Sequence, residues 1–276
     1  MNDSTNLLSL EGLVFEATEI KIDGHVLSIT LNRPEKRNAI NTVMGNEIAY
    51  ALSYASQESN VRVVIIQAKG EVFCAGGDLA SMSGQVEETV STVPKIGGFD
   101  SISLLIRNIN KPVICKIQGS VYAGALLMVS NATHAIAVNE AKFAAPEIKR
   151  GIWPFMVMAG LFRVMPKRQG LDFIMRGEAI DAMTAEKYGL ITQAVGKDEL
   201  DQTVNKLATD FANLPPKTMK MGLAAYNRQD AMAFDDALPY LKEQLAKCLQ
   251  AEDAKEGIAA FFEKREPKWK GGKNAS

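Results

Sequence analysis

The chain has 276 residues, of which 47% are hydrophobic and 23% charged, a balance typical of a globular protein that buries a core. Its 31 basic and 32 acidic residues give a formal net charge of −1, which argues against an electrostatic match to nucleic acid or to an anionic membrane surface. Three scattered cysteines, no N-terminal secretory pattern and no apolar run approaching ~20 residues favour a cytoplasmic protein without disulfides or membrane spans.

The first elements along the chain are predicted to be two strands, a helix and a buried strand. Residues 14–22 and 25–31 have strand character and are joined by Asp23-Gly24, a hairpin signal. Asn41 is a candidate cap for a helix in which apolar residues recur every four positions. The mostly β-branched run 61-VRVVIIQA-68 is typical of a strand buried on both faces.

The middle of the chain alternates between strands and helices. Residues 83–100 are polar and rich in small residues, and we interpret them as a loop or a loose helix. The pattern predicts strands at 113–119, 134–138, 142–144 and 190–196 and helices at 101–109, 120–131, 154–163, 167–176 and 184–188. Such alternation implies an α/β core with largely parallel strands, in which ligand sites lie where strands end and helices begin.

From about residue 199 the sequence contains helical patterns only. The predicted helices span 199–213, 216–227, 231–250 and 253–264. We therefore predict an α/β core over residues 1–198 and a helical region over residues 199–276.

The two histidines, His25 and His134, are weak candidates for catalysis. Neither has a second ligand-type residue at a spacing that suits a metal ion. Both are interpreted as turn or surface residues, so the sequence predicts neither a metal site nor a Ser-His-Asp triad.

Two turns combine the end of a strand with small residues, 74-CAGGDL-79 and 119-GSVYAGA-125. Small side chains let a ligand approach the backbone, and the first N–H groups of a helix are unpaired. Two such N–H groups directed at one oxygen would form an oxyanion hole, in which each donor contributes about 3 kcal/mol. Either turn alone fits a packing role equally well.

An isolated acid, Glu147, precedes a turn that leads into the apolar run 154-PFMVMAGLF-162. Desolvation by such surroundings raises the pKa of a carboxyl group and makes its carboxylate a stronger base. The alternative is a structural acid that caps a helix or pairs with Lys149 or Arg150.

Five blocks together resemble the crotonase superfamily, the enoyl-CoA hydratase/isomerase enzymes. They are 30-TLNRPEKRNAI-40, 71-EVFCAGGDLASM-82, 111-KPVICKIQGSVYAGA-125, 146-PEIKRGI-152 and 256-EGIAAFFEKREPKW-269. The resemblance covers about 15–269, with the blocks in the expected order and spacing. It implies an α/β spiral of repeated β-β-α units, a C-terminal helical region that forms trimers, and a homotrimer or a hexamer of two trimers.

The resemblance also implies an acyl-CoA thioester as the substrate. Coenzyme A would enter as part of that substrate, so no separate cofactor and no metal is expected. The backbone N–H groups of Ala75 and Gly124 would stabilise an enolate oxygen, and Glu147 would be the catalytic acid/base. The residues expected along the substrate and its CoA moiety are Arg33, Lys36, Arg37, Ala75, Gly76, Asp78, Leu79, Leu127, Trp153, Phe155, Phe261 and Lys264.

Several of these substrate contacts have alternatives. For Lys36 and Arg37 a solvated-surface role fits almost as well as a phosphate or adenine contact. Trp153 and Phe155 would either line the acyl pocket or simply pack.

The chain departs from the hydratases at two places. Those enzymes carry two glutamates, and here the first position is Leu127 while the second is Glu147. Bulky residues from Phe155 onward replace the small residues that follow the proline in hydratases, and they are expected to exclude water. Both changes favour a Δ3,Δ2-enoyl-CoA isomerase, in which one carboxylate moves a proton from C2 to C4.

Other readings stay open. The first is an enoyl-CoA hydratase with a one-glutamate site, and related crotonase chemistries include decarboxylation, thioester hydrolysis and aromatic side-chain processing. The second is a non-catalytic acyl-CoA-binding protein. Cys74 beside the first small-residue turn is interpreted as a buried small residue rather than a nucleophile, because no histidine base is near it in sequence.

Overall fold

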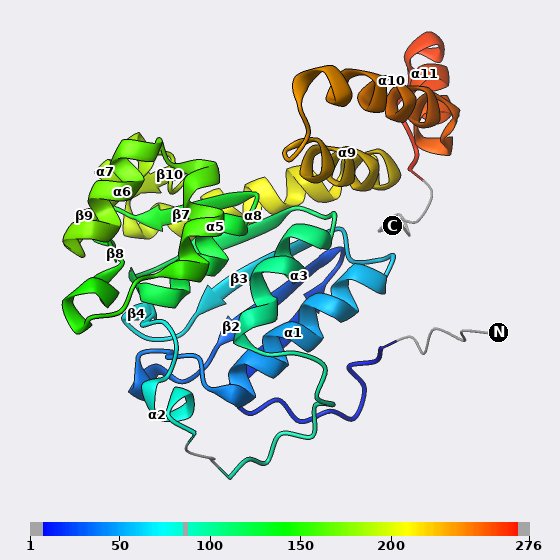
Figure 1. Cartoon of the computed structure of the whole chain (residues 1–276). Coiled ribbons are helices and arrows are strands. Elements are labelled where there is room, and N and C mark those ends of the chain that lie inside the picture. Colours follow the sequence, from blue (N-terminus) through cyan, green and yellow to red (C-terminus); the bar gives the residue numbers. More distant parts are fainter. Residues whose placement is uncertain (1–7, 85–87, 270–276) are drawn as a thin grey trace, which may run out of the picture.

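The computed structural model describes residues 8–84 and 88–269, and Figure 1 shows an α/β body from which three C-terminal helices project. The larger sheet has the strand order β1-β2-β3-β5-β7-β10. Its strands are β1 (Thr18–Asp23), β2 (Val26–Leu31), β3 (Val63–Ala68), β5 (Val113–Ile117), β7 (His134–Val138) and β10 (Gln193–Val195). Only β1 and β2 pair antiparallel, which confirms both the predicted hairpin and the largely parallel core.

A second, smaller sheet contains β4 (Val72–Cys74), β6 (Ser120–Tyr122), β8 (Lys142–Ala144) and β9 (Ile180–Asp181), in that order. The first three are parallel to one another. The prediction of one helix over 120–131 is wrong at its start. Strand β6 and a 3-10 turn at Ala123–Ala125 precede α4 (Leu126–Asn131), and a strand of three residues is too short to show a period of two.

The helices of the body lie between these strands along the chain. Helix α1 (Thr42–Gln57) begins as predicted at Asn41, whose Oδ1 accepts a hydrogen bond from Met44 N at 2.8 Å. The others are α2 (Leu79–Met82), α3 (Ile102–Asn108), α5 (Phe155–Val164), α6 (Lys167–Arg176) and α7 (Ala182–Lys187). None of the helices in the described ranges is long and apolar enough to cross a membrane.

The last four helices are α8 (Leu200–Ala212), α9 (Pro216–Gln229), α10 (Phe234–Gln250) and α11 (Glu252–Glu263). Helix α8 buries Leu200, Val204 and Ala208 in the hydrophobic core of the body and packs on β2, β3, β5 and β7. Only α9, α10 and α11 stand apart (Figure 1). We therefore propose that the separate helical region starts after α8 rather than at residue 199. The two ends, 1–7 and 270–276, lie outside the described residues.

The segment at 88–98 has no helix or strand, as predicted for a loop, while residues 85–87 lie outside the described residues. The buried side chain of Asn46 on α1 holds the later part of this segment. Its Nδ2 donates to the carbonyl oxygens of Val93 and Pro94, and its Oδ1 accepts from Ile96 N at 2.9 Å. The loop is thus fixed to α1 immediately before Phe99.

Candidate active site at the edge of the small sheet

The small sheet brings the two small-residue turns and the isolated acid to one edge. In its register Cys74 pairs with Val121, and Tyr122 pairs with Ala144. Because these strands are parallel, the segments that follow them leave from the same edge. Gly77, Gly124 and Glu147 follow β4, β6 and β8 within three residues, and β6 lies between the other two strands.

The first expected donor, Ala75, requires correction. Its N–H group donates to the carbonyl oxygen of Arg37 at 3.0 Å and is therefore engaged. Gly77 offers the alternative. The Gly76 carbonyl and the Asp78 N–H group both bond to Ile40, so the N–H group between them is directed to the other side.

The role of Gly124 as the second donor stays a prediction. It is the second residue of the 3-10 turn at Ala123–Ala125, a position whose N–H group has no acceptor within the turn. Among the described residues neither Gly77 N nor Gly124 N has a hydrogen-bond acceptor. The geometry therefore offers two free backbone donors, one from each turn.

Gly76 lets the two turns approach each other. A methyl group on Gly76 would lie 2.8 Å from Ala123 Cβ and 3.0 Å from Gly124 N, and its φ of +97° favours glycine. Ala123 has a φ of +52°, an uncommon conformation for a residue with a side chain. Both features lie beside the two free donors, where such backbone strain is typical of functional sites.

Glu147 follows the end of β8, and its carboxyl group has few hydrogen-bond partners. Its Oε2 is buried and has no hydrogen-bond partner. Burial raises the pKa of the Glu147 carboxyl, while its own backbone amide and Arg150 act in the opposite direction. The fully buried Glu47 differs, because it accepts hydrogen bonds from Glu16 N, Ala17 N and Thr18 Oγ1. Glu47 is a structural acid, whereas Glu147 has the environment of a base.

The surroundings of Glu147 agree only partly with the sequence prediction. Leu127 is 3% exposed and belongs to the hydrophobic core, so no carboxylate stands at that position. Trp153 is half-buried, and its Nε1 donates to Met158 Sδ at 3.1 Å. Phe155, however, is 72% exposed. Phe155 therefore does not pack in the core of the single chain, and the expectation that the run from Phe155 onward excludes water beside Glu147 stays a prediction.

Cys74 and the histidines are structural. The Cys74 thiol is fully buried, burial raises its pKa to about 12, and its Sγ donates to Asn38 O at 3.0 Å. A thiolate is therefore disfavoured at this position. His134 begins β7 and contacts the ring of Phe211. Nowhere in the described residues do three or more histidine, cysteine or acidic residues gather as a metal site.

Comparison with known proteins agrees with this geometry. The model of the enoyl-CoA hydratase/isomerase family matches residues 21–273. A mevalonyl-coenzyme A hydratase of Aspergillus fumigatus is 31% identical over 255 residues, which are 89% of this chain and 92% of that protein. The chain belongs to the enoyl-CoA hydratase/isomerase family.

Further members of the family support the same placement. A probable enoyl-CoA hydratase of Mycobacterium tuberculosis is 28% identical over 258 residues, covering 93% of this chain and 99% of its own. The crystal structure of human enoyl-CoA hydratase domain-containing protein 3 is 26% identical, with a TM-score of 0.84 over 92% of this chain and 100% of that one. The predicted crotonase fold is thereby confirmed.

Among the residues at 33–37 that are expected to contact CoA, Arg33 has a side chain that already binds other residues of the chain. The Arg33 side chain donates to Ala39 O at 2.7 Å and pairs with Asp78 at 3.1 Å. Asp78 in turn caps α2 by accepting from Ala80 N at 3.0 Å. Arg33 and Asp78 thus hold each other and the loop, and their expected role as direct substrate contacts stays a prediction.

Other expected contacts lie on the surface. The side chains of Lys36 and Arg37 are exposed on the loop that follows β2, and Leu79 is exposed at the start of α2. Phe261 is 79% exposed at the end of α11, next to Lys264. Figure 1 shows α11 at the far end of the molecule from α2 and β4. A single chain therefore does not bring Phe261 and Lys264 to the site.

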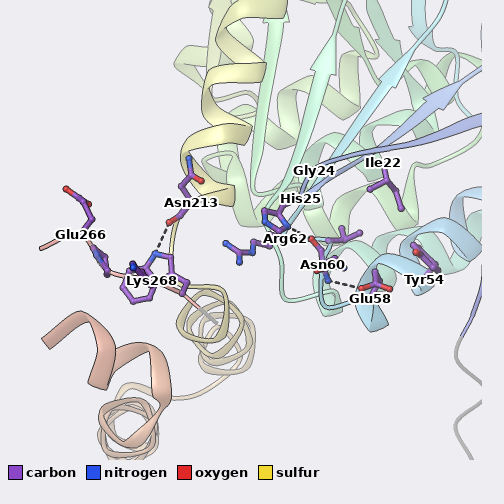
Figure 2. A pocket seen from close by; sticks show the side chains of 13 residues that line it. Ile22, Gly24, His25, Tyr54, Glu58, Asn60, Arg62, Asn213, Glu266 and Lys268 are labelled. Atoms are coloured by element: carbon purple, nitrogen blue, oxygen red, sulfur yellow. Dashed lines mark hydrogen bonds between the residues drawn. The ribbon is translucent and has the colours of Figure 1, made fainter. Parts of the chain in front are cut away.

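A separate cavity of about 900 Å³ lies at the end of the larger sheet where β2 and β3 begin (Figure 2). His25 lines it, with Nδ1 2.8 Å from Asn60 O, as expected of a turn histidine. The buried Arg62 donates from Nη1 to Ala212 O at 2.8 Å. No residue predicted for catalysis or substrate binding lines this cavity.

Three site residues were not found from the sequence. The register of β4 with β6 would have pointed to Gly77, but the sequence did not predict the small sheet. Asn38 is fully buried at a φ of +52°, and its side chain joins the predicted CoA-binding loop at 33–38 (hereafter the CoA loop) to Lys69 and to the start of β4. Phe99 lies close to Gly124, where an added methyl group would be 2.3 Å from its Cζ, and it gave no signal because the two residues are distant in sequence.

Proposed function

We propose that this protein shifts a double bond in an acyl-CoA thioester from the Δ3 to the Δ2 position, with Glu147 as its single acid and base. The observation that carries the proposal is the Glu147 carboxyl group, which has one buried oxygen without a partner and a raised pKa. Leu127 stands where a second carboxylate is expected. A lone desolvated acid is suited to moving a proton between two carbons.

The proposed steps use the two backbone donors and the acid. The thioester oxygen binds between the N–H groups of Gly77 and Gly124. The Glu147 carboxylate takes a proton from C2, and the electrons of that C–H bond form an enolate whose charge the two N–H groups stabilise. The carboxyl group then returns the proton to C4, so that the double bond moves from C3–C4 to C2–C3 and the enzyme is unchanged.

A second candidate is hydration of a 2-enoyl-CoA. It is favoured by the names of two relatives, a mevalonyl-coenzyme A hydratase and a probable enoyl-CoA hydratase. In this chain Glu147 alone would have to hold and activate the water, because the residue at the other position is Leu127.

Product analysis with two substrates tests the proposal. The purified protein should convert a 3-enoyl-CoA to the 2-enoyl-CoA rapidly and should add water to a 2-enoyl-CoA slowly or not at all. Rapid formation of the β-hydroxyacyl-CoA would replace the proposal by hydration. Tight binding of both thioesters with no reaction, and no exchange of C2 hydrogen in heavy water, would instead support a non-catalytic acyl-CoA-binding protein.

We also propose that the protein acts as a homotrimer or as a hexamer of two trimers. Helices α10 and α11 bury few side chains in the single chain and expose large apolar ones. These exposed residues are Phe234, Leu238, Leu245, Leu249, Ile258, Phe261 and Phe262. An apolar surface of this kind is typical of a protein interface. A neighbouring copy would also supply Phe261 and Lys264 to the CoA loop.

We further propose a cytoplasmic location. All three cysteines, Cys74, Cys115 and Cys248, are free thiols, which suits a reducing compartment. Fractionation of cells that express the full chain tests this location.

A further inference from the structure

We infer that Phe99 is a specificity-determining residue of the proposed acyl-CoA site, where it restricts the substrate to acyl groups that are slender next to the thioester carbonyl. This inference rests on the proposed function, because it takes Gly77 and Gly124 as the donors to that carbonyl.

The ring of Phe99 lies against both glycines. A methyl group on Gly124 would lie 2.3 Å from Phe99 Cζ, and a methyl group on Gly77 would lie 4.0 Å from the same atom. Met82 also approaches Gly77, with its Sδ 3.1 Å from the methyl position on that residue. An acyl group whose carbonyl reaches the two donors therefore meets the tip of an aromatic ring and a thioether.

The backbone that carries this ring is fixed. A methyl group on Gly45 would lie 2.9 Å from Phe99 N, so the backbone of Phe99 rests directly on α1. Asn46 holds the preceding segment through four hydrogen bonds. Ser101 Oγ donates to Gly98 O at 2.7 Å. Space for a larger acyl group must therefore come from the side chain of Phe99 rather than from its backbone.

The side chain of Phe99 is also held by the core. Phe99 is half-buried and packs on the hydrophobic core, so moving its ring would cost apolar contacts. A branched or aromatic acyl group would have to displace that packing, whereas a straight chain would pass beside it. Discrimination of this kind by an apolar wall is commonly about tenfold or more for each carbon that does not fit.

Binding of two unreactive thioesters tests the inference. Butyryl-CoA is slender, whereas phenylacetyl-CoA carries a phenyl ring, the group that Phe99→Ala removes. Calorimetry should show that the wild type binds butyryl-CoA about tenfold or more tightly than phenylacetyl-CoA. Phe99→Ala should reduce that ratio by about tenfold or more, and Phe99→Leu should give an intermediate ratio. Leu104→Ala, which changes an exposed residue of α3, should keep the wild-type ratio.

The outcomes separate this inference from the proposed function. If the wild type and both Phe99 variants bind butyryl-CoA but the ratio is the same in all three, Phe99 does not determine specificity and the proposed function stands. If the wild type binds neither thioester, the proposed acyl-CoA function is wrong and this inference is wrong with it. Circular dichroism of each variant shows that the comparison is made between folded proteins.

Discussion

The backbone N–H group of Ala75 donates its hydrogen bond to the carbonyl oxygen of Arg37, 3.0 Å away. This bond joins the loop that follows β2 to the end of β4. The Gly77 N–H group two residues later, like that of Gly124, has no acceptor among the described residues. The proposed oxyanion hole therefore uses the second glycine of the Cys-Ala-Gly-Gly turn.

Replacing single backbone amides by esters should separate the roles of Gly77 and Ala75. Glycolic acid in place of Gly77 removes the N–H group and should lower kcat by about 10²–10³-fold, because a donor to the enolate oxygen is lost. Lactic acid in place of Ala75 should lower the free energy of unfolding by about 1 kcal/mol with little change in kcat, because it removes a structural hydrogen bond. The reverse pattern would return the donor role to Ala75.

Glu147→Gln should change the dependence of stability on pH. Burial raises the pKa of Glu147 above its ordinary value of 4.5. The folded protein therefore holds this proton at a higher pH than the unfolded chain does, and the associated stability is fully present below the unfolded pKa and is lost as the pH rises through the folded pKa. Removing the ionisable group should make Glu147→Gln more stable than the wild type at neutral pH.

Urea unfolding across pH measures this effect. The stability difference between Glu147→Gln and the wild type should shrink as the pH falls towards about 4. Glu140→Gln, a change at an exposed site, is the matched control and should show no such trend. A difference that stays constant from neutral to acid pH would contradict the raised pKa.

Asn38 is expected to be the main structural residue of the CoA loop. Its Nδ2 donates to the carbonyl oxygens of Lys69 and Val72 at 2.8 Å each, and its Oδ1 accepts from Arg33 N at 2.9 Å. Asn38→Ala leaves these buried groups without partners and should lower the free energy of unfolding by about 3 kcal/mol.

Asn38→Gly is the matched variant. It loses the same hydrogen bonds but adopts the left-handed φ of +52° without strain, so it should be destabilised less than Asn38→Ala. Denaturant unfolding measures both variants. Wild-type stability in both would show that the side chain of Asn38 does not hold the loop.

Mixed oligomers should show whether a neighbouring copy completes the CoA site. Lys264→Ala keeps Glu147 but should bind acyl-CoA weakly, and Glu147→Gln keeps Lys264 but should not turn over. After the two variants are unfolded and refolded together, some sites should combine an intact Glu147 with an intact Lys264 from another copy. The activity of the mixture should then exceed the sum of the two variants, whereas a simple sum would show that each chain builds its own site.

The sequence predicts the fold well where the elements are long. The buried strand at 63–68, the Asn41-capped helix and the C-terminal helices are recognised from periodicity and capping. The small sheet is not recognised as a sheet, because its strands have two or three residues and only β8, at 142–144, is predicted as a strand. Because this sheet is not predicted, the first donor is assigned to Ala75 instead of Gly77. Only the pairing of Cys74 with Val121 shows which amide lies beside Gly124.

The remaining differences arise from contacts between distant segments. The ion pair of Arg33 with Asp78 and the approach of Phe99 to Gly124 join residues more than twenty positions apart. No local pattern encodes such contacts. The exposure of Phe155 has a similar origin, because an apolar residue at the start of a helix faces either the core or a surface according to the rotation of that helix.

The central claim is that Glu147 moves a proton on an acyl-CoA held by backbone donors, and the most direct measurement is the fate of a 3-enoyl-CoA in heavy water. Magnetic resonance should show that the wild type forms the 2-enoyl-CoA. Glu147→Gln should be slower by about 10²–10⁴-fold while binding the thioester with nearly unchanged affinity. Equal rates in the two proteins, or a β-hydroxyacyl-CoA as the first product, would contradict the claim.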